Sequence, residues 1–176
     1  MEIRKATIND IDAVADIYER IHDAEECGEV VIGWERGVYP TRDTAMEALK
    51  REDLFVLEDN SKIVGTGILN KIQVDVYEGA DWEYEADPEK VMVMHTLVID
   101  PKENGKGYGK SFVQFYEKYA LENGCPYLRM DTNEKNRVAR NMYKGLGYKE
   151  IGIASCVFNG MNDINLVLIE NYLKLR

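Results

Sequence analysis

The chemistry of the chain concentrates in one stretch, which reads Val98-Ile99-Asp100-Pro101-Lys102-Glu103-Asn104-Gly105-Lys106-Gly107-Tyr108-Gly109-Lys110-Ser111. The apolar run at 91–99 predicts a buried strand, the three glycines predict a turn, and the residues after them predict a helix. Glycines let successive backbone N–H groups converge, and a helix N-terminus adds partial positive charge. This combination predicts an anion site suited to phosphate or pyrophosphate, with added charge from Lys106 and Lys110. The alternative is a glycine-rich turn that binds nothing.

Two nucleotide-binding motifs do not fit this loop. The dinucleotide fingerprint is G-x-G-x-x-G, whereas the glycines here are spaced Gly105-x-Gly107-x-Gly109. A P-loop reads G-x-x-x-x-G-K-[ST]; residues 109–111 supply its end, but Asn104 stands at its first position. Too little chain follows the loop for the parallel sheet that a P-loop serves.

The composition predicts one folded domain over residues 1–176. Hydrophobic residues make up 45% and charged residues 31%, which is the balance of a globular protein rather than a disordered chain. The formal net charge of −10 argues against nucleic acid as a partner, because an acidic surface repels phosphate. The same charge is compatible with a cationic substrate.

Cysteine usage and hydropathy predict a cytoplasmic location. The cysteines at 27, 125 and 156 have no short spacing, so we expect neither a disulfide framework nor a metal motif. No apolar run follows the charges of residues 1–5, and no apolar stretch is long enough to span a bilayer. We therefore expect neither a signal peptide nor contact with a membrane.

The periodicity of the remaining chain predicts an α+β fold with a mixed sheet. Strands are expected at 1–6, 54–57, 62–71, 91–99, 127–132, 148–158 and 163–170. Helices are expected after 10, after 41, after 109 and around 138–146. Two hairpins with helices between them, rather than strict alternation of strand and helix, favour this fold class.

The glycine loop resembles the acetyl-CoA-binding motif of the GNAT superfamily of N-acetyltransferases. That motif reads L-x-V-x-P, a short spacer, then [QR]-x-x-G-x-[GA]. The matching residues here are Leu97, Ile99 and Pro101 in the strand part and Gly107 and Gly109 in the loop. Asn104 departs from the pattern, because Gln or Arg is usual at its position, but the backbone cradle is intact.

The resemblance covers nearly the whole chain in the right order. Residues 136–148 (NRVARNMYKGLGY) are similar to the family segment N-x-x-A-x-x-x-Y-x-x-x-G-[FY]. Residues 3–10 are similar to its opening strand and helix, and the hairpin at 55–65 to its second and third strands. The resemblance implies a mostly antiparallel sheet flanked by helices, and acetyl transfer from acetyl-CoA to a primary amine without a metal. It also implies that two copies can pair, since dimers are common in the family. A catalytically silent module that senses acyl-CoA is the alternative.

The resemblance also implies how CoA is held. The strand at 91–99 splays from the strand at 127–132, and the pantetheine arm pairs in the gap with the backbone of Leu97, Val98 and Ile99. Asn136 bonds the arm from the facing side. The pyrophosphate rests on the loop, where the expected contacts are Asn104, Gly105, Lys106, Gly107, Tyr108, Gly109 and Lys110.

The reaction calls for a base and an acid. An alkyl ammonium has a pKa near ~10.4 and must lose a proton before it attacks a thioester. We predict His95 as the base, because its strand position is a frequent site of the family's base. The alternatives are Glu58, a water held by an acidic residue, or a purely structural core role for His95. Tyr143 resembles the family's general acid, which protonates the CoA sulfur. The Val98 N–H is expected to meet the charge on the thioester oxygen.

The acceptor is expected to be a small-molecule or peptide amine. Residues 75–89 hold seven acids interleaved with Tyr77, Trp82 and Tyr84, a pattern that would hold a cationic amine by charge and cation–π contact. The alternative is a solvated loop. Residues 34–40 lie where related proteins commonly build the other wall of the acceptor site. Their Trp34 and Tyr39 fit packing anchors equally well.

Overall fold

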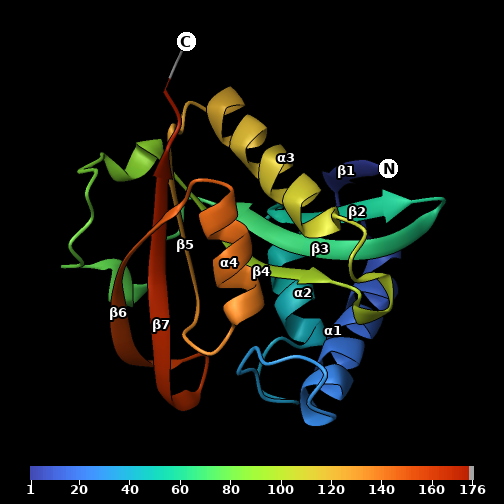
Figure 1. The fold of residues 1–176 in the computed structure, drawn as a ribbon. Coiled ribbons are helices and arrows are strands. Elements are labelled where there is room, and N and C mark those ends of the chain that lie inside the picture. The colour runs from blue at the N-terminus through green and yellow to red at the C-terminus, as the bar shows by residue number, and fades with distance from the viewer. Residues whose placement is uncertain (175–176) are drawn as a thin grey trace.

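A computed structural model describes residues 1–174, whose strands form one seven-stranded sheet in the order β1-β2-β3-β4-β5-β7-β6 (Figure 1). The strands are β1 Glu2–Lys5, β2 Leu54–Asp59, β3 Lys62–Asn70, β4 Val91–Ile99, β5 Tyr127–Asn133, β6 Lys149–Phe158 and β7 Met161–Tyr172. The helices of eight residues or more are α1 Ile11–Glu26, α2 Arg42–Lys50, α3 Tyr108–Glu122 and α4 Arg137–Gly145. No helix within these residues is long and apolar enough to cross a membrane.

Every neighbouring pair of strands is antiparallel except β4 and β5, which run parallel. The predicted α+β fold with a mixed, mostly antiparallel sheet is therefore confirmed. The parallel pairing joins 91–94 to 127–130 and goes no further. Beyond Met94 and Met130 the two strands separate, as the family resemblance implied, and this splay creates the gap on which the site depends.

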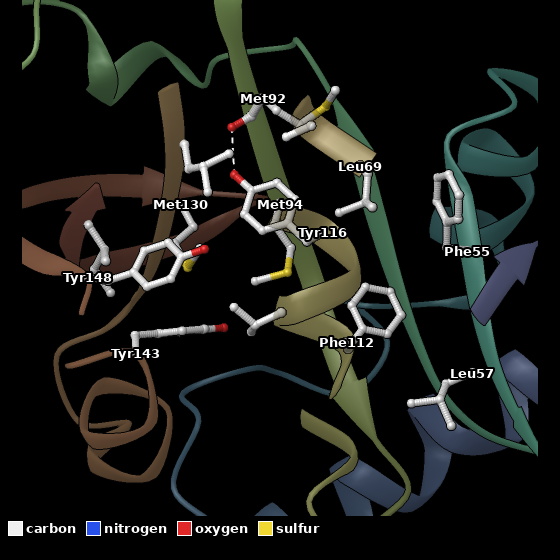
Figure 2. Close-up of a cluster of buried hydrophobic side chains, with 14 of the residues drawn as sticks. Phe55, Leu57, Leu69, Met92, Met94, Phe112, Tyr116, Met130, Tyr143 and Tyr148 are labelled. Atoms are coloured by element: carbon white, nitrogen blue, oxygen red, sulfur yellow. Dashed lines mark hydrogen bonds between the residues drawn. The ribbon is translucent and has the colours of Figure 1, made fainter. Parts of the chain in front are cut away.

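One tyrosine fastens the two strands just before they separate. Tyr116 of α3 is fully buried, and its hydroxyl donates to the Met92 carbonyl of β4 at 2.6 Å (Figure 2). The same hydroxyl lies 3.2 Å from the Arg129 carbonyl of β5. Because one buried hydroxyl reaches both strands, the paired half of β4 and β5 is held together from the α3 side.

The helices cover the sheet on two faces. Helices α3 and α4 pack on one face, where Phe112 and Tyr116 stand over Met94 and Met130 (Figure 2). Helices α1 and α2 cover the other face at its β2–β4 end, around Tyr18 and Val98. Nonpolar burial of this kind is the main force that holds helices to a sheet.

Residues 71–90, between β3 and β4, cover the remaining part of the sheet (green in Figure 1). Their aromatic side chains turn inward: Tyr77 is buried, and Trp82 lies under the Arg129 guanidinium, 4.1 Å from it. All seven acids at 75–89 are exposed. The predicted cation–π contact thus exists, but the cation is the protein's own arginine, while the acids face solvent as the alternative expectation had it.

Candidate active site

A cleft of about 760 Å³ opens between the end of β4, the start of α3 and the side of α4. The α1–α2 loop contributes residues 29–32 to its wall. It is lined by every residue that the sequence predicted for cofactor contact: Leu97, Val98, Ile99, Asn104, Gly105, Lys106, Gly107, Tyr108, Gly109, Lys110 and Asn136. The fold therefore brings residues 97–110 close to Asn136, although α3 and β5 separate them in the sequence.

The loop between β4 and α3 is shaped to cradle an anion. Gly107 precedes α3 with φ of 81°, a left-handed conformation that glycine adopts without strain. The N–H groups of Tyr108, Gly109 and Lys110 open the helix and have no acceptor within it. Together with the helix dipole they favour a bound phosphate or pyrophosphate. The residues present fit the pyrophosphate of CoA.

Two buried or shielded acids hold this loop in place. Asp100 is fully buried and accepts from the Lys102 backbone N–H at 3.0 Å and from Arg20 Nε of α1 at 3.1 Å. Glu103 pairs with Lys62 and Lys106, and these two cations lower the Glu103 pKa to about 2. In this structure Lys106 is thus balanced by its own loop.

The backbone of β4 offers hydrogen-bonding groups to the gap. The Asp100 N–H donates to the Val64 carbonyl of β3 at 2.9 Å. Since alternate residues of a strand point their N–H groups to opposite sides, the Val98 N–H also faces β3, where Val98 pairs with Thr66. The Ile99 N–H, by the same alternation, faces the gap. This geometry corrects the expectation that Val98 supplies the N–H to the thioester oxygen.

Helix α4 forms the facing wall. Asn136 caps it: its Oδ1 accepts from the Ala139 N–H at 3.1 Å, so the amide NH₂ is the part left to bond a ligand. Val138 is 83% exposed and Met142 is half-buried, and both line the cleft. A Cβ on Gly109 would lie 3.0 Å from the Met142 sulfur, so glycine there lets α3 and α4 approach closely.

A second, smaller cavity of about 80 Å³ adjoins the cleft. Five residues line both spaces: Ile32, Leu97, Asn136, Ala139 and Tyr143. The cavity passes through the gap between β4 and β5, from α4 toward the α1–α2 loop. A thioester carried along the cleft would reach its end at this junction.

Tyr143 stands at the junction. It projects from α4 toward Met94 and packs near Tyr148, with ring centroids 6.0 Å apart (Figure 2). Burial raises the pKa of its hydroxyl well above the usual value, so the group stays protonated at neutral pH. A protonated hydroxyl beside the end of the cleft can donate to a leaving sulfur.

His95 also lines the smaller cavity, on β4. Its Nε2 lies 3.0 Å from Asn70 Oδ1, an arrangement in which Nε2 carries the proton and donates. Burial lowers the pKa of the imidazole to about 4, so the ring is uncharged at neutral pH. The next residue, Thr96, has a φ of 52°, which is rare for a β-branched residue, and lies where the β3–β4 register shifts. This bulge marks the point where β4 leaves β5.

Sequence reasoning missed Asp131 of β5, which lines the same cavity. Its Oδ2 accepts from the Tyr77 hydroxyl at 2.7 Å. Burial raises the pKa of the Asp131 carboxyl to about 6. The available signal was a lone acid in the predicted strand at 127–132, directly after the apolar Met130.

Two loops from opposite ends of the chain roof the cavity. Trp34 and Tyr39 of the α1–α2 loop line it, as does Phe158 of β6. At the β6–β7 turn, a Cβ on Gly160 would lie 3.6 Å from Val38 of that loop. The acids at 75–89 are not among the residues that line either space. The segment 34–40 thus contributes Trp34 and Tyr39 to the cavity lining, and its role as an acceptor wall stays a prediction. The acidic segment reaches the cavity through Tyr77 and its bond to Asp131.

Comparison with known proteins gives matches over most of the chain. A family model described as the acetyltransferase (GNAT) family matches residues 13–148. The chain is 24% identical over 154 residues to the uncharacterized N-acetyltransferase MJ1207 of Methanocaldococcus jannaschii, a match covering 84% of this chain and 60% of that protein. It is 22% identical over 150 residues to the uncharacterized N-acetyltransferase YhfO of Bacillus subtilis, covering 85% of this chain and 91% of that protein. The chain thus spans about 60% of the length of the first relative.

Solved structures share the fold over nearly the full chain. A GNAT family acetyltransferase from Streptococcus agalactiae superposes with a TM-score of 0.80 at 20% identity, covering 99% of this chain and 96% of that one. A putative acetyltransferase from Salmonella typhimurium, solved with acetyl-CoA, superposes with a TM-score of 0.69 at 16% identity, covering 100% of this chain and 95% of that one.

Proposed function

The chain belongs to the GNAT acetyltransferase family, and from this premise we propose that it transfers the acetyl group of acetyl-CoA to a primary amine. The amine attacks the thioester directly, without an acetylated enzyme intermediate. We further propose that residues 1–176 form a single domain, which is supported by the one continuous sheet.

One observation carries this proposal, namely the junction of the cleft with the smaller cavity. The cleft has a phosphate cradle at one end, and Leu97 and Tyr143 at the other. The cavity begins at these same two residues and holds titratable side chains. Two substrates that enter from opposite sides of the gap would therefore meet at Tyr143. Such an arrangement supplies proximity and orientation, which are large contributions to the rate of a two-substrate reaction.

Each step of the proposed acetyl transfer is then assigned to particular residues. The gap-facing N–H of Ile99 and the backbone of Leu97 hold the pantetheine arm and polarise the thioester oxygen. Tyr143 gives its proton to the sulfur as the carbon–sulfur bond breaks. The amine must arrive uncharged, so a group in the cavity must take its proton, and His95 is the candidate that the sequence predicted.

The test is amine-dependent release of free thiol from acetyl-CoA, with a panel of amines and mass spectrometry of the products. We expect thiol and N-acetyl product to appear in equal amounts. Binding of acetyl-CoA with no thiol release for any amine would instead support the silent acyl-CoA-binding alternative. The cytoplasmic location, the pairing of two copies and the lack of a nucleic-acid or membrane partner stay predictions.

A further inference from the structure

We propose that Asp131 is the acceptor-recognising residue, which binds the ammonium of a compact primary monoamine and takes its proton. The inference rests on the proposed function and names the acceptor class that the same site selects. It departs from the sequence prediction by placing proton uptake on β5 rather than on His95 of β4.

The position of Asp131 supports this role. It directly follows Met130, the last β5 residue paired with β4, and it is partly exposed and lines the smaller cavity. The Tyr77 hydroxyl occupies its Oδ2, at 2.7 Å, which leaves Oδ1 with no partner among the described residues. Asp131 is partly buried, and a cationic N–H donor supplied by a substrate would give Oδ1 a charge-assisted hydrogen bond.

Three aromatic side chains, Trp34, Tyr39 and Phe158, line the same cavity. The Trp34 and Tyr39 rings meet edge to face with centroids 5.7 Å apart, and Tyr39 meets Phe158 in the same way at 6.0 Å. Aromatic faces attract cations and pack well against alkyl groups. A cavity lined by one carboxylate and three aromatic rings therefore suits an ammonium that carries a short apolar substituent.

Size and charge narrow the acceptor class. The cavity volume of about 80 Å³ is smaller than the ~150 Å³ that accommodates benzene in an engineered apolar cavity. Asp131 is the one acid among the described residues that line it. A polyamine would bury a second charge without a partner, and a peptide would need to pass the roof that the α1–α2 loop and the β6–β7 turn form. A monoamine with a few carbon atoms fits both limits.

Two protons leave the ammonium in the course of the reaction. The first passes to the Asp131 carboxylate and then to solvent, leaving a neutral amine in the cavity. The nitrogen then bonds the thioester carbon, the carbon–sulfur bond breaks, and Tyr143 gives its proton to the sulfur. The second proton of the nitrogen replaces the one that Tyr143 gave. The products are the N-alkyl acetamide, CoA with a free thiol, and one released proton.

Proton transfer to Asp131 is favoured over transfer to His95. In a cavity shielded from water, a neutral amine beside a neutral acid is less costly than a buried ion pair. The burial that raises the Asp131 pKa to about 6 brings it toward the operating pH, whereas burial takes the His95 pKa away from it, to about 4. The other titratable groups near Asp131 are Tyr77, Tyr39, Cys156 and Tyr143.

The experiment compares the natural protein with Asp131→Asn and His95→Gln, with Asp81→Asn as an exposed-acid control. The acceptors are ethylamine, butylamine, 1,4-diaminobutane and an alanyl peptide, each with acetyl-CoA. We expect the two monoamines to have a kcat/KM at least about tenfold above the other acceptors. Asp131→Asn should lose about 100-fold in kcat/KM for butylamine, the usual scale for a general base. Its Kd for acetyl-CoA should stay within about twofold, since Asp131 lies outside the larger cleft.

Calorimetric binding of butylamine, measured without acetyl-CoA, separates this inference from the proposed function. Loss of amine binding in Asp131→Asn supports the ammonium site even if no thiol is released. Absence of thiol release would overturn the proposed acetyl transfer but not the ammonium site. The assignment of Asp131 fails if Asp131→Asn binds and turns over butylamine as the natural protein does. It also fails if His95→Gln shows the larger loss, or if the diamine or the peptide is the best acceptor.

Discussion

At the residue scale, the proposed reaction depends on the hydroxyl of Tyr143, which lies at the junction of the two spaces. Tyr143→Phe removes that hydroxyl and keeps the ring that packs near Tyr148. We expect kcat to fall about 100-fold, because the sulfur then leaves without a proton donor, while the Kd for acetyl-CoA changes little. Steady-state kinetics and calorimetric titration give the two values. Tyr148→Phe is the matched control, because its hydroxyl donates to Glu117 and it lines neither space. Unchanged turnover in Tyr143→Phe would remove it from the mechanism.

The buried carboxyl of Asp131 also has a consequence for stability. Burial raises its pKa from 3.8 to about 6, so the folded protein holds this proton more tightly than the unfolded chain. Stability is therefore lost as pH rises from about 4 to about 6, and the loss is complete above that range. Since one pKa unit corresponds to about 1.4 kcal/mol, the cost at pH 7.5 is at most about 3 kcal/mol.

Asp131→Asn removes this cost and keeps an oxygen that accepts from Tyr77. We expect the variant to be about 1 to 3 kcal/mol more stable than the natural protein at pH 7.5, with no difference at pH 4. Urea unfolding at both pH values measures this. The exposed Asp81→Asn should follow the natural protein at both. A stabilised variant with reduced activity is the usual signature of a functional group held at a cost to the fold. A variant that is less stable at pH 7.5 would contradict a buried, destabilising charge.

At the scale of elements, the splay of β4 from β5 must begin at a fixed point. Tyr116 holds the paired half through the Met92 and Arg129 carbonyls. Tyr116→Phe should lower the free energy of unfolding by about 1 to 2 kcal/mol, because it removes a buried hydrogen bond without changing the ring. Denaturant titration measures this loss. Tyr119→Phe is the control, since the half-buried Tyr119 packs through its ring against Phe55. Equal losses in the two variants would show that the strands do not need this hydroxyl.

The elements also show which parts of the site could be predicted from sequence. The strand, loop and helix at 91–122 follow from apolar run length, glycine conformation and helical spacing, all of which act within a short segment. The apolar stripe Val138 and Met142 predicted a helix correctly, but a stripe facing a ligand cleft has the same spacing as one facing a core. The structure leaves Val138 83% exposed for that reason.

Asp131 and Trp82 mark the limit of such reasoning, since their roles depend on contacts between distant segments. Nothing near Asp131 in the sequence announces that β4 leaves β5 beside it, or that residues 34–39 and 158–160 close over it. Trp82 looked free to bind a substrate cation, yet Arg129 from another strand takes that place. Local patterns predicted the glycine loop, whereas the smaller cavity could be recognised only from the fold.

At the scale of the whole molecule, many of the acids that make the chain negative lie apart from the residues that line the two spaces. The net charge of −10 includes seven acids at 75–89, all exposed and outside both spaces. These acids favour solubility, whereas the cationic residues Lys106, Lys110, Lys135 and Arg137 line the cleft. Under the proposal for Asp131, the acceptor is selected by one carboxylate in the cavity and not by the overall acidity of the chain.

Binding of acetyl-CoA should stabilise the whole molecule, because the ligand meets groups on β4, α3 and α4 that come together only in the folded state. At a concentration of about 100 times Kd, the gain is about 2.7 kcal/mol, which raises the Tm of a chain of this size by about 5 to 10 °C. Thermal unfolding with and without acetyl-CoA measures the shift. Magnesium ATP should produce no shift, because the loop does not match a P-loop.

Two glycine variants test whether the Tm shift with acetyl-CoA comes from binding at the loop between β4 and α3. Gly107 and Gly79 both have left-handed φ, of 81° and 72°, with open space where a Cβ would lie. Valine at either position should therefore cost a similar amount of stability. Only Gly107→Val should also lose most of the acetyl-CoA shift, because the changed backbone would turn the N–H groups at the start of α3 away from the pyrophosphate. A full shift in Gly107→Val would mean that the ligand binds elsewhere.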